Sequence, residues 1–155
     1  MIRKALEKDI PEILNLLKQV NLVHHKGRPD LFKIGTKYSE TDLKHLMHNP
    51  NNPIWVYTDQ NDEVLGYCFC VIVRRDSDPI LTDVKTLYID DLCVDERCRR
   101  KGIGKALYGS ALELAKKIGC HNLTLNAWAC NPSALGFYKS LGLVPQKVCL
   151  EKIID

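Results

Sequence analysis

The sequence has no long apolar run, no paired-cysteine motif and no strong excess of charge of one sign. Its apolar stretches are short, whereas a helix that crosses a bilayer needs about 18 to 20 apolar residues. The opening MIRKALEKDI carries charges where a signal peptide has its apolar core. We therefore expect a cytoplasmic protein that has no membrane span.

The cysteines do not form a disulfide or zinc pattern. Their number, 7, is odd, and no two of them are spaced C-x-x-C. Most lie in apolar segments that resemble strands, which favours buried free thiols; these are Cys68, Cys70, Cys93 and Cys149. His45 and His48 share a predicted helix face but have no third ligand, so no metal site is expected.

The charge balance also limits the class of partner. A net charge of +3 is small for a nucleic-acid-binding domain, whose pI usually exceeds about 9. The chain of 155 residues is 45% hydrophobic and 26% charged, as is typical of one soluble globular domain. A chain of this length can bury a core without disulfides or metals, so residues 1–155 are predicted to form a single domain.

The first 40 residues predict a strand, a helix and a long loop. MIRKA is typical of a short strand. Asp9 and Glu12 have the spacing of a capping box, and the apolar residues that follow predict an amphipathic helix to Val20. The polar stretch 21–38, which holds His24 and His25, is interpreted as a loop of functional length.

The middle of the chain predicts a short helix and three strands. Ser39 and Asp42 have capping spacing and start the helix. Segments 54–58, 63–73 and 84–94 are rich in β-branched and aromatic residues and are separated by turn residues. We expect these three segments to form an antiparallel meander.

The last third of the chain changes to alternating helices and strands. Apolar residues recur at helical spacing over 103–118, and Gly119 stands where a left-handed cap belongs. A strand is predicted over 122–128, parallel to 84–94 through a right-handed crossover. Asn131 and Pro132 predict the cap and first turn of a further helix that ends at Gly142, and 144–153 is predicted as a last strand.

A basic, glycine-containing loop lies between the third strand of the meander and the clearest helix. Glycines allow backbone amides to approach a ligand, and a helix N-terminus favours anions. Ala106 stands where a P-loop needs Ser or Thr, and Leu107 stands where a dinucleotide fingerprint needs its third glycine. The segment predicts an anion site of another type, unless its glycines serve packing and its charges are merely solvated; it comprises Arg99, Arg100, Lys101, Gly102, Ile103, Gly104 and Lys105.

In these residues the sequence resembles the GNAT N-acetyltransferase superfamily. Residues 99–104 match the acetyl-CoA loop R/Q-x-x-G-x-G/A, and the loop follows a strand that ends Leu-Cys-Val. Residues 131–143 resemble the later N-x-x-A-x-x-F/Y-Y-x-x-x-G-F element, with Leu143 in place of the final aromatic residue. The resemblance covers residues 84–145, and the N-terminal half agrees in its order of elements.

The resemblance implies an α/β domain of the α+β type. It has a mixed sheet of six strands, in which an antiparallel meander adjoins a splayed parallel pair, with four flanking helices. It implies acetyl-CoA as acetyl donor, with the pantetheine arm on the backbone of Leu92, Cys93 and Val94 and the pyrophosphate on residues 99–105. Asn131 caps its helix, touches the cofactor, or does both.

Acetyl transfer to an amine needs a base and an acid. Tyr138 is the candidate acid for the departing thiolate, the alternative being a core aromatic residue, which is the preferred interpretation of Phe137. Asp90 and Asp91 interrupt an apolar strand, and regular alternation sends them to opposite faces. The segment YIDDLCV resembles the Y-x-E-D-x-x-V pattern of polyamine-acetylating members, which favours Asp90 as the base or as an attractor of cationic amines; a salt-bridged strand acid is the alternative.

The expected activity is therefore direct transfer of an acetyl group from acetyl-CoA to a primary amine of a small molecule or a peptide. A non-catalytic module that binds acyl-CoA is the alternative. A nucleic-acid-binding domain is disfavoured, because four acids, Asp90, Asp91, Asp95 and Glu96, stand beside the basic loop. The segments 24–32 and 74–79 are in the positions that wall the acceptor site in the superfamily, but their mixed charges select no substrate. The resemblance also allows for a homodimer.

Overall fold

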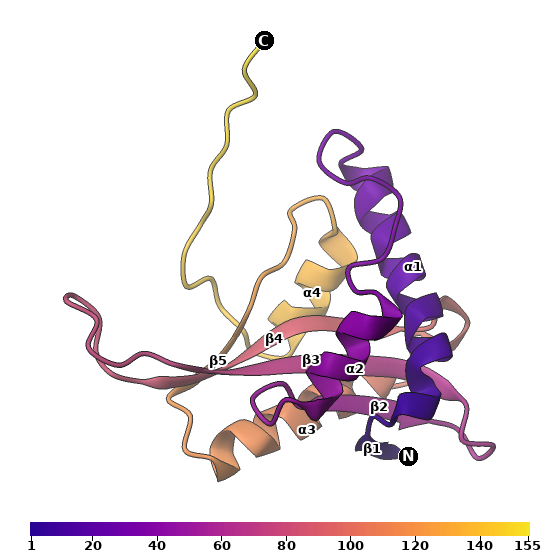
Figure 1. Cartoon of the computed structure of the whole chain (residues 1–155). Helices are drawn as coiled ribbons and strands as arrows, with labels where there is room; N and C mark the ends of the chain where they lie inside the picture. The colour runs from indigo at the N-terminus through magenta and orange to yellow at the C-terminus, as the bar shows by residue number, and fades with distance from the viewer.

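The computed structural model describes residues 1–155 and contains one mixed five-stranded sheet in the order β1-β2-β3-β4-β5 (Figure 1). The first four strands are antiparallel neighbours, and β5 is parallel to β4. The antiparallel meander and the parallel crossover predicted from the sequence are therefore confirmed. The strands are β1 (Ile2–Lys4), β2 (Ile54–Thr58), β3 (Val64–Arg74), β4 (Lys85–Val94) and β5 (Asn122–Leu125).

Four α-helices cover the sheet, as Figure 1 shows. Two buried clusters lie on opposite faces of the sheet, one beneath the first two helices and the other beneath the third. No helix is both long enough and apolar enough to cross a membrane. The helices are α1 (Ile10–Gly27), α2 (Glu40–His48), α3 (Ile103–Lys117) and α4 (Pro132–Ser140).

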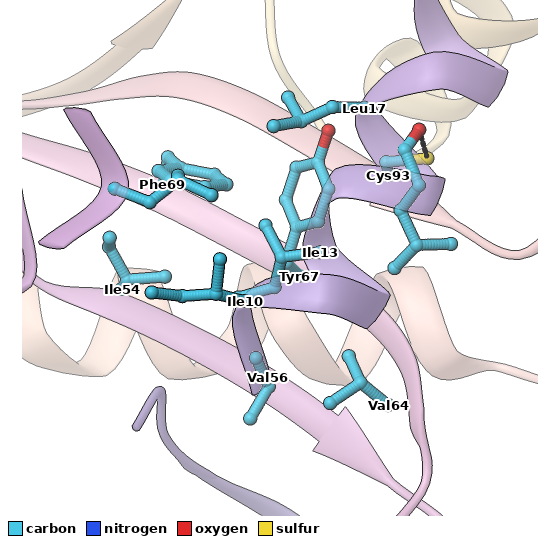
Figure 2. Close-up of a cluster of buried hydrophobic side chains, with 11 residues drawn as sticks. Ile10, Ile13, Leu17, Ile54, Val56, Val64, Tyr67, Phe69 and Cys93 are labelled. Atoms are coloured by element: carbon cyan, nitrogen blue, oxygen red, sulfur yellow. Dashed lines mark hydrogen bonds between the residues drawn. The ribbon is translucent and has the colours of Figure 1, made fainter. Parts of the chain in front are cut away.

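The cluster under α1 and α2 is the side of the core that adjoins the acidic strand residues. Figure 2 shows Tyr67 and Phe69 of β3 among aliphatic side chains of α1 and β2. The two rings meet edge to face at 4.7 Å between centroids, a geometry that adds to the gain from burial. Tyr67 and Phe69 are paired with Cys93 and Asp91 of β4, so this cluster lies next to the acidic residues of that strand.

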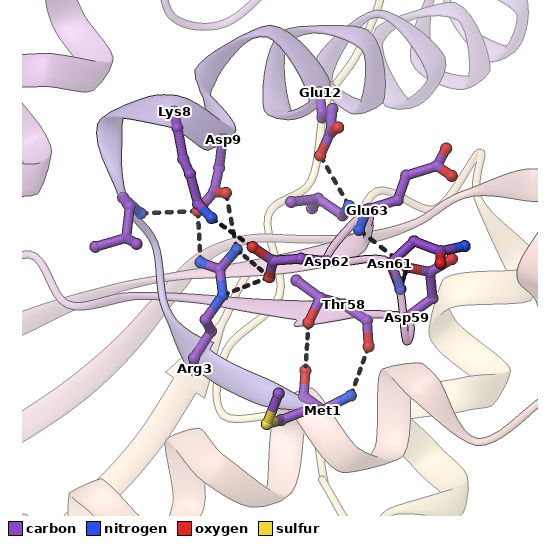
Figure 3. Close-up of polar contacts among 12 residues, drawn as sticks. Met1, Arg3, Lys8, Asp9, Glu12, Thr58, Asp59, Asn61, Asp62 and Glu63 are labelled. Carbon is purple, nitrogen blue, oxygen red and sulfur yellow. Dashed lines mark hydrogen bonds and ion pairs between the residues drawn. The ribbon is translucent and has the colours of Figure 1, made fainter.

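The start of α1 differs from the sequence prediction. Asp9 does not form a capping box with Glu12; its carboxylate binds the Arg3 guanidinium at 2.7 and 2.9 Å and the Leu6 amide at 2.8 Å, as Figure 3 shows. Glu12 instead accepts a hydrogen bond from the Val64 amide at 2.8 Å. A bidentate guanidinium is a stronger partner for a carboxylate than a helix amide, so tertiary pairing overrides the local motif.

The α1 helix is also longer than predicted. It continues to Gly27, so His24 and His25 lie on its last turns and not in a loop. The polar composition of 21–27 does not indicate a helix. The last turns of α1 nevertheless pack against the segment that follows them, where the His24 and Phe32 rings lie 5.0 Å apart. Tertiary contacts of this kind commonly outweigh weak local propensity.

Several local predictions are confirmed. Ser39 and Asp42 form the capping box of α2, with the Asp42 amide 3.1 Å from the Ser39 hydroxyl. Gly119 is left-handed, with φ of 71°, directly after α3. Asn131 caps α4 by accepting from the Ala134 amide at 3.2 Å.

The predicted last strand is wrong, and the sheet therefore has five strands and not six. Residues 144–155 form no helix or strand and extend away from the sheet (Figure 1). We call this segment the C-terminal arm. It contacts the rest of the chain through an ion pair between Glu151 and Arg28. Its apolar residues are 63% to 88% exposed; they are Val144, Val148, Leu150, Ile153 and Ile154.

Candidate active site

The site begins where β4 and β5 separate. The parallel ladder joins Thr86–Ile89 to Asn122–Leu125 and then stops. From Asp90 onward, β4 has no strand partner on this edge, although it stays paired with β3 on the other edge to Val94. The backbone of Leu92, Cys93 and Val94 therefore presents an open strand edge, to which an extended ligand can bind by main-chain hydrogen bonds.

A β-bulge places both adjacent aspartates on one face. Phe69 is paired with Asp91 and Cys70 with Ile89, so Asp90 is an extra residue in β4. The regular alternation expected from the sequence is therefore wrong at this point. Both carboxylates contact groups on the α1 and α2 face of the sheet.

The two carboxylates have different partners. Asp90 accepts a hydrogen bond from the Tyr38 hydroxyl at 2.5 Å and binds the Lys37 ammonium at 2.8 Å. Asp91 accepts from the Tyr67 hydroxyl at 2.9 Å. Asp90 is thus neutralised by a lysine from the segment between α1 and α2, whereas Asp91 is held by a neutral phenol.

The electrostatics of Asp91 suit a proton acceptor. Burial raises its pKa to about 6, although the hydrogen bond from Tyr67 and the charge of Lys37 act in the opposite direction. A carboxyl with a pKa near neutrality combines basicity with ionisation at physiological pH. Burial also raises the pKa of the nearby Cys93 thiol to about 12, so this cysteine remains a neutral thiol.

Tyr138 projects into the same region from α4. Its hydroxyl forms no hydrogen bond within the chain. Burial raises the pKa of Tyr138, and the negative charge of Asp91 adds to the effect. A phenol in this environment keeps its proton and is available as a donor.

The basic loop has the geometry of an anion site. Gly102 is left-handed, with φ of 80°, and a β-carbon there would meet nothing within 4 Å. The α3 helix begins at the next residue, so its first-turn amides have no intrahelical acceptor. Arg99, Arg100, Lys101 and Lys105 are all exposed beside this turn.

Gly104 lies against α4 at the start of α3. A β-carbon at this position would lie 3.2 Å from Phe137 Cζ, so the glycine allows α3 to pack closely on α4. Its small size therefore serves helix packing. Phe137 itself is half-buried, with its ring 5.2 Å from that of Tyr138, which fits its interpretation as a packing residue.

Three aromatic rings meet near the end of α1. The Phe32 ring meets Trp128 edge to face at 4.9 Å, and His24 lies 5.0 Å from Phe32. These contacts bring the end of α1, the segment after it and the loop between β5 and α4 to one place. By contrast, 74–79 lies at the far end of the β3–β4 hairpin (Figure 1).

Sequence reasoning missed the residues that hold the two aspartates. Lys37 and Tyr38 lie in the segment 21–38, which the sequence predicts as a loop, and the sequence predicts Tyr67 only as part of a strand. Only the register of β3 against β4, which pairs Tyr67 with Cys93 and Phe69 with Asp91, reveals the proximity of Tyr67 to the carboxylates. No cluster of three or more metal-ligating side chains is present in the structure.

The comparison with protein families decides the identity. Residues 20–143 match the acetyltransferase (GNAT) family. The chain belongs to this family. It is a GNAT-type N-acetyltransferase, an enzyme that transfers an acyl group to an amine.

Individual relatives agree with the family. The thialysine N-epsilon-acetyltransferase of Bos taurus is 27% identical over 153 residues, which cover 92% of this chain and 82% of that protein. The peptidyl-lysine N-acetyltransferase YjaB of Salmonella typhimurium is 34% identical over 103 residues, or 65% of this chain and 58% of that protein.

Solved structures share the GNAT fold. The BH1408 protein of Bacillus halodurans, in a tetramutant form, superposes with a TM-score of 0.95 at 28% identity and 99% coverage of both chains. An aminoglycoside acetyltransferase from a soil metagenome has a TM-score of 0.74 at 22% identity, over 100% of this chain and 96% of that one, which shows likeness of fold alone.

Proposed function

We propose that this GNAT enzyme uses acetyl-CoA to acetylate a cationic primary amine in a direct, ternary-complex reaction. The observation that carries the proposal is the convergence of the open edge of β4, two aspartates on one face and the unpartnered hydroxyl of Tyr138. An alternative, a regulatory module that binds acyl-CoA without turnover, has no need of this acid and base pair.

The cofactor would follow the open strand edge. Its pantetheine arm would pair with the backbone of Leu92, Cys93 and Val94. Its pyrophosphate would bind at the first turn of α3 and the basic side chains of residues 99–105. The Asn131 oxygen caps α4, which leaves the side-chain amide free to donate to the cofactor.

The acceptor would bind beside the aspartates as an ammonium. Asp90 would attract and orient it, and Asp91 would take its proton, because a charged ammonium has no lone pair. The free amine then attacks the thioester carbonyl carbon, so a C–N bond forms while the C–S bond breaks. Tyr138 would give its proton to the departing thiolate, which otherwise leaves poorly at neutral pH. The acylated nitrogen would then give its second proton to the Tyr138 phenolate, and the proton on Asp91 would leave to water.

The acceptor class follows from charge and from the relatives. Two carboxylates on one face of β4 suit a cation, and the Phe32 and Trp128 rings near the end of α1 suit an aliphatic arm. The bovine relative is named for thialysine and YjaB for peptidyl-lysine. We propose a lysine-like amine on a small molecule or a peptide, and neither nucleic acid nor membrane as a partner.

Thiol release separates the two candidate functions. The purified chain would be mixed with acetyl-CoA and, in turn, lysine, thialysine, a lysine-containing peptide and a neutral-chain amine. An enzyme of the proposed class releases thiol faster with the cationic amines than without an acceptor. Binding of acetyl-CoA with no release for any amine would favour the regulatory module.

We further propose that two copies associate in the cytoplasm through the C-terminal arm. Exposed apolar residues on an extended segment are costly unless a partner covers them, and the outer edge of β5 has no strand neighbour. Light scattering on the full chain would then give a dimer, and a chain that ends at Leu143 would give a monomer. A monomeric full chain would refute this assembly.

A further inference from the structure

One lysine of the chain already occupies the acidic site. Lys37 Nζ lies 2.8 Å from Asp90 Oδ1 and 3.2 Å from the main-chain oxygen of Asp90. Its positive charge also acts to lower the pKa of Asp91 and that of His24. No other lysine forms an ion pair with either of the two aspartates.

The Lys37 ammonium lies at the point where β4 and β5 separate. The main-chain oxygen that it contacts belongs to the bulge residue, where β4 loses its β5 partner. The charge of Lys37 acts to lower the pKa of Asp91, and the charge of Asp91 acts to raise the pKa of Tyr138. Lys37 Nζ therefore shares one electrostatic neighbourhood with the proposed base and the proposed acid.

The ion pair of Lys37 with Asp90 is open to solvent on the lysine side. Lys37 lies between α1 and α2, outside both helices, and its side chain is 45% exposed. The Asp90 side chain is 16% exposed, and an ion pair that is open to solvent on one side is weaker than a fully buried one, because water screens its charges. The contact with Asp90 is thus weak enough to exchange with another ammonium.

We propose that Lys37 is an internal acceptor and that the enzyme acetylates its own Lys37 side chain. The inference rests on the proposed function, because acetyl-CoA is the co-reactant. The Lys37 ammonium gives one proton to Asp91, and its nitrogen then attacks the thioester carbon. The N–C bond forms, the C–S bond breaks, and the thiolate takes the Tyr138 proton. The acylated nitrogen then loses its second proton to the Tyr138 phenolate, and the proton on Asp91 leaves to water.

Acetylation would change the site that performs it. The product is a neutral amide, which cannot form an ion pair with Asp90. Asp90 would then be free for the ammonium of an external acceptor. The modified enzyme should therefore show a lower KM for a lysine-like amine than the unmodified enzyme.

The test is incubation of the full chain with acetyl-CoA and no added amine, followed by intact mass and peptide mapping. We expect one acetyl group, on Lys37, with a rate constant that does not depend on protein concentration. Lys33 is the matched control, because it is exposed in the same segment and forms no ion pair. Lys37→Arg should remove the modification, and Lys33→Arg should leave it unchanged.

Three further outcomes decide between explanations. Tyr138→Phe should slow Lys37 acetylation by about 10² to 10⁴, the usual contribution of a positioned acid. If Lys37 and Lys33 are acetylated at equal rates, and Tyr138→Phe leaves both rates unchanged, the acetylation is not catalysed by the site and the inference is overturned. Turnover of an external amine with Lys37 unmodified would overturn the inference and leave the proposed function standing. Failure of both reactions would overturn the proposed function itself.

Discussion

Replacing Asp91 by asparagine should make the protein more stable and less active. The substitution keeps the shape of the side chain and its ability to accept the Tyr67 hydrogen bond, but removes the buried negative charge. Burial raises the pKa of Asp91 from 3.8 to about 6. Holding this group ionised at pH 7 therefore costs the folded state about 3 kcal/mol, since each pKa unit corresponds to about 1.4 kcal/mol.

The sign of the pH dependence follows from proton binding. Between pH 3.8 and about 6, the folded state holds a proton on Asp91 that the unfolded state has lost. Stability from this group is thus greatest below that window, falls as the pH rises through it and is constant above it. Asp91→Asn should gain up to about 3 kcal/mol at pH 7, or about 6 to 12 °C in Tm, and almost nothing below about pH 4.

Urea and thermal unfolding at several pH values would measure this effect. Asp95→Asn is a matched control of opposite sign, because hydrogen bonds from Arg97 lower the pKa of Asp95 to about 2. That variant should lose stability at pH 7. If Asp91→Asn lowers the free energy of unfolding equally at pH 4 and pH 7, burial of the Asp91 charge does not cost the folded state stability, and the reasoning is wrong. Single-turnover acetylation should fall about 10² to 10⁴ in the same variant.

Other variants test the remaining parts of the site. Asp90→Asn should lower kcat/KM for a cationic amine by about one to three orders of magnitude while acetyl-CoA binding persists; an unchanged kcat/KM in steady-state assays would remove Asp90 from the site. Tyr138→Phe should slow single-turnover transfer by about 10² to 10⁴ without weakening cofactor binding, and a wild-type rate would leave Tyr138 as a packing residue. Acetyl-CoA at about 100 times its Kd should stabilise the fold by about 2.7 kcal/mol, a gain that calorimetry should find reduced in Gly102→Val, because the left-handed turn at α3 resists a β-branched residue. Loss of the gain for Lys152→Gln, a control on the C-terminal arm, would place the cofactor elsewhere.

Features encoded by short-range patterns could be predicted from the sequence. The Ser39 cap, the left-handed Gly119 after α3 and the glycine of the basic loop depend on residues within a few positions of each other. The antiparallel meander and the parallel crossover followed from the order of strands and helices, since right-handed crossovers are nearly universal. The segment around the basic loop was sufficient to indicate the family, because its motif also consists of residues that are close together in the sequence.

Features set by pairing between distant segments could not be read in this way. Asp9 has the spacing of a cap, but Arg3 binds it. A strand forms only where another backbone supplies its hydrogen bonds. Residues 144–153 have no such partner in the sheet, so the strand predicted there does not form.

The bulge shows the same division within the site itself. Two adjacent acids in a regular strand must face opposite ways, and nothing in the local sequence marks Asp90 as an extra residue. Only the register of β4 against β3 turns both carboxylates to one face, and only the separation of β5 opens the strand edge beside them. The sequence thus determined which acidic and aromatic side chains the chain carries in these segments, whereas tertiary pairing, which depends on partners far along the chain, determined how those side chains meet.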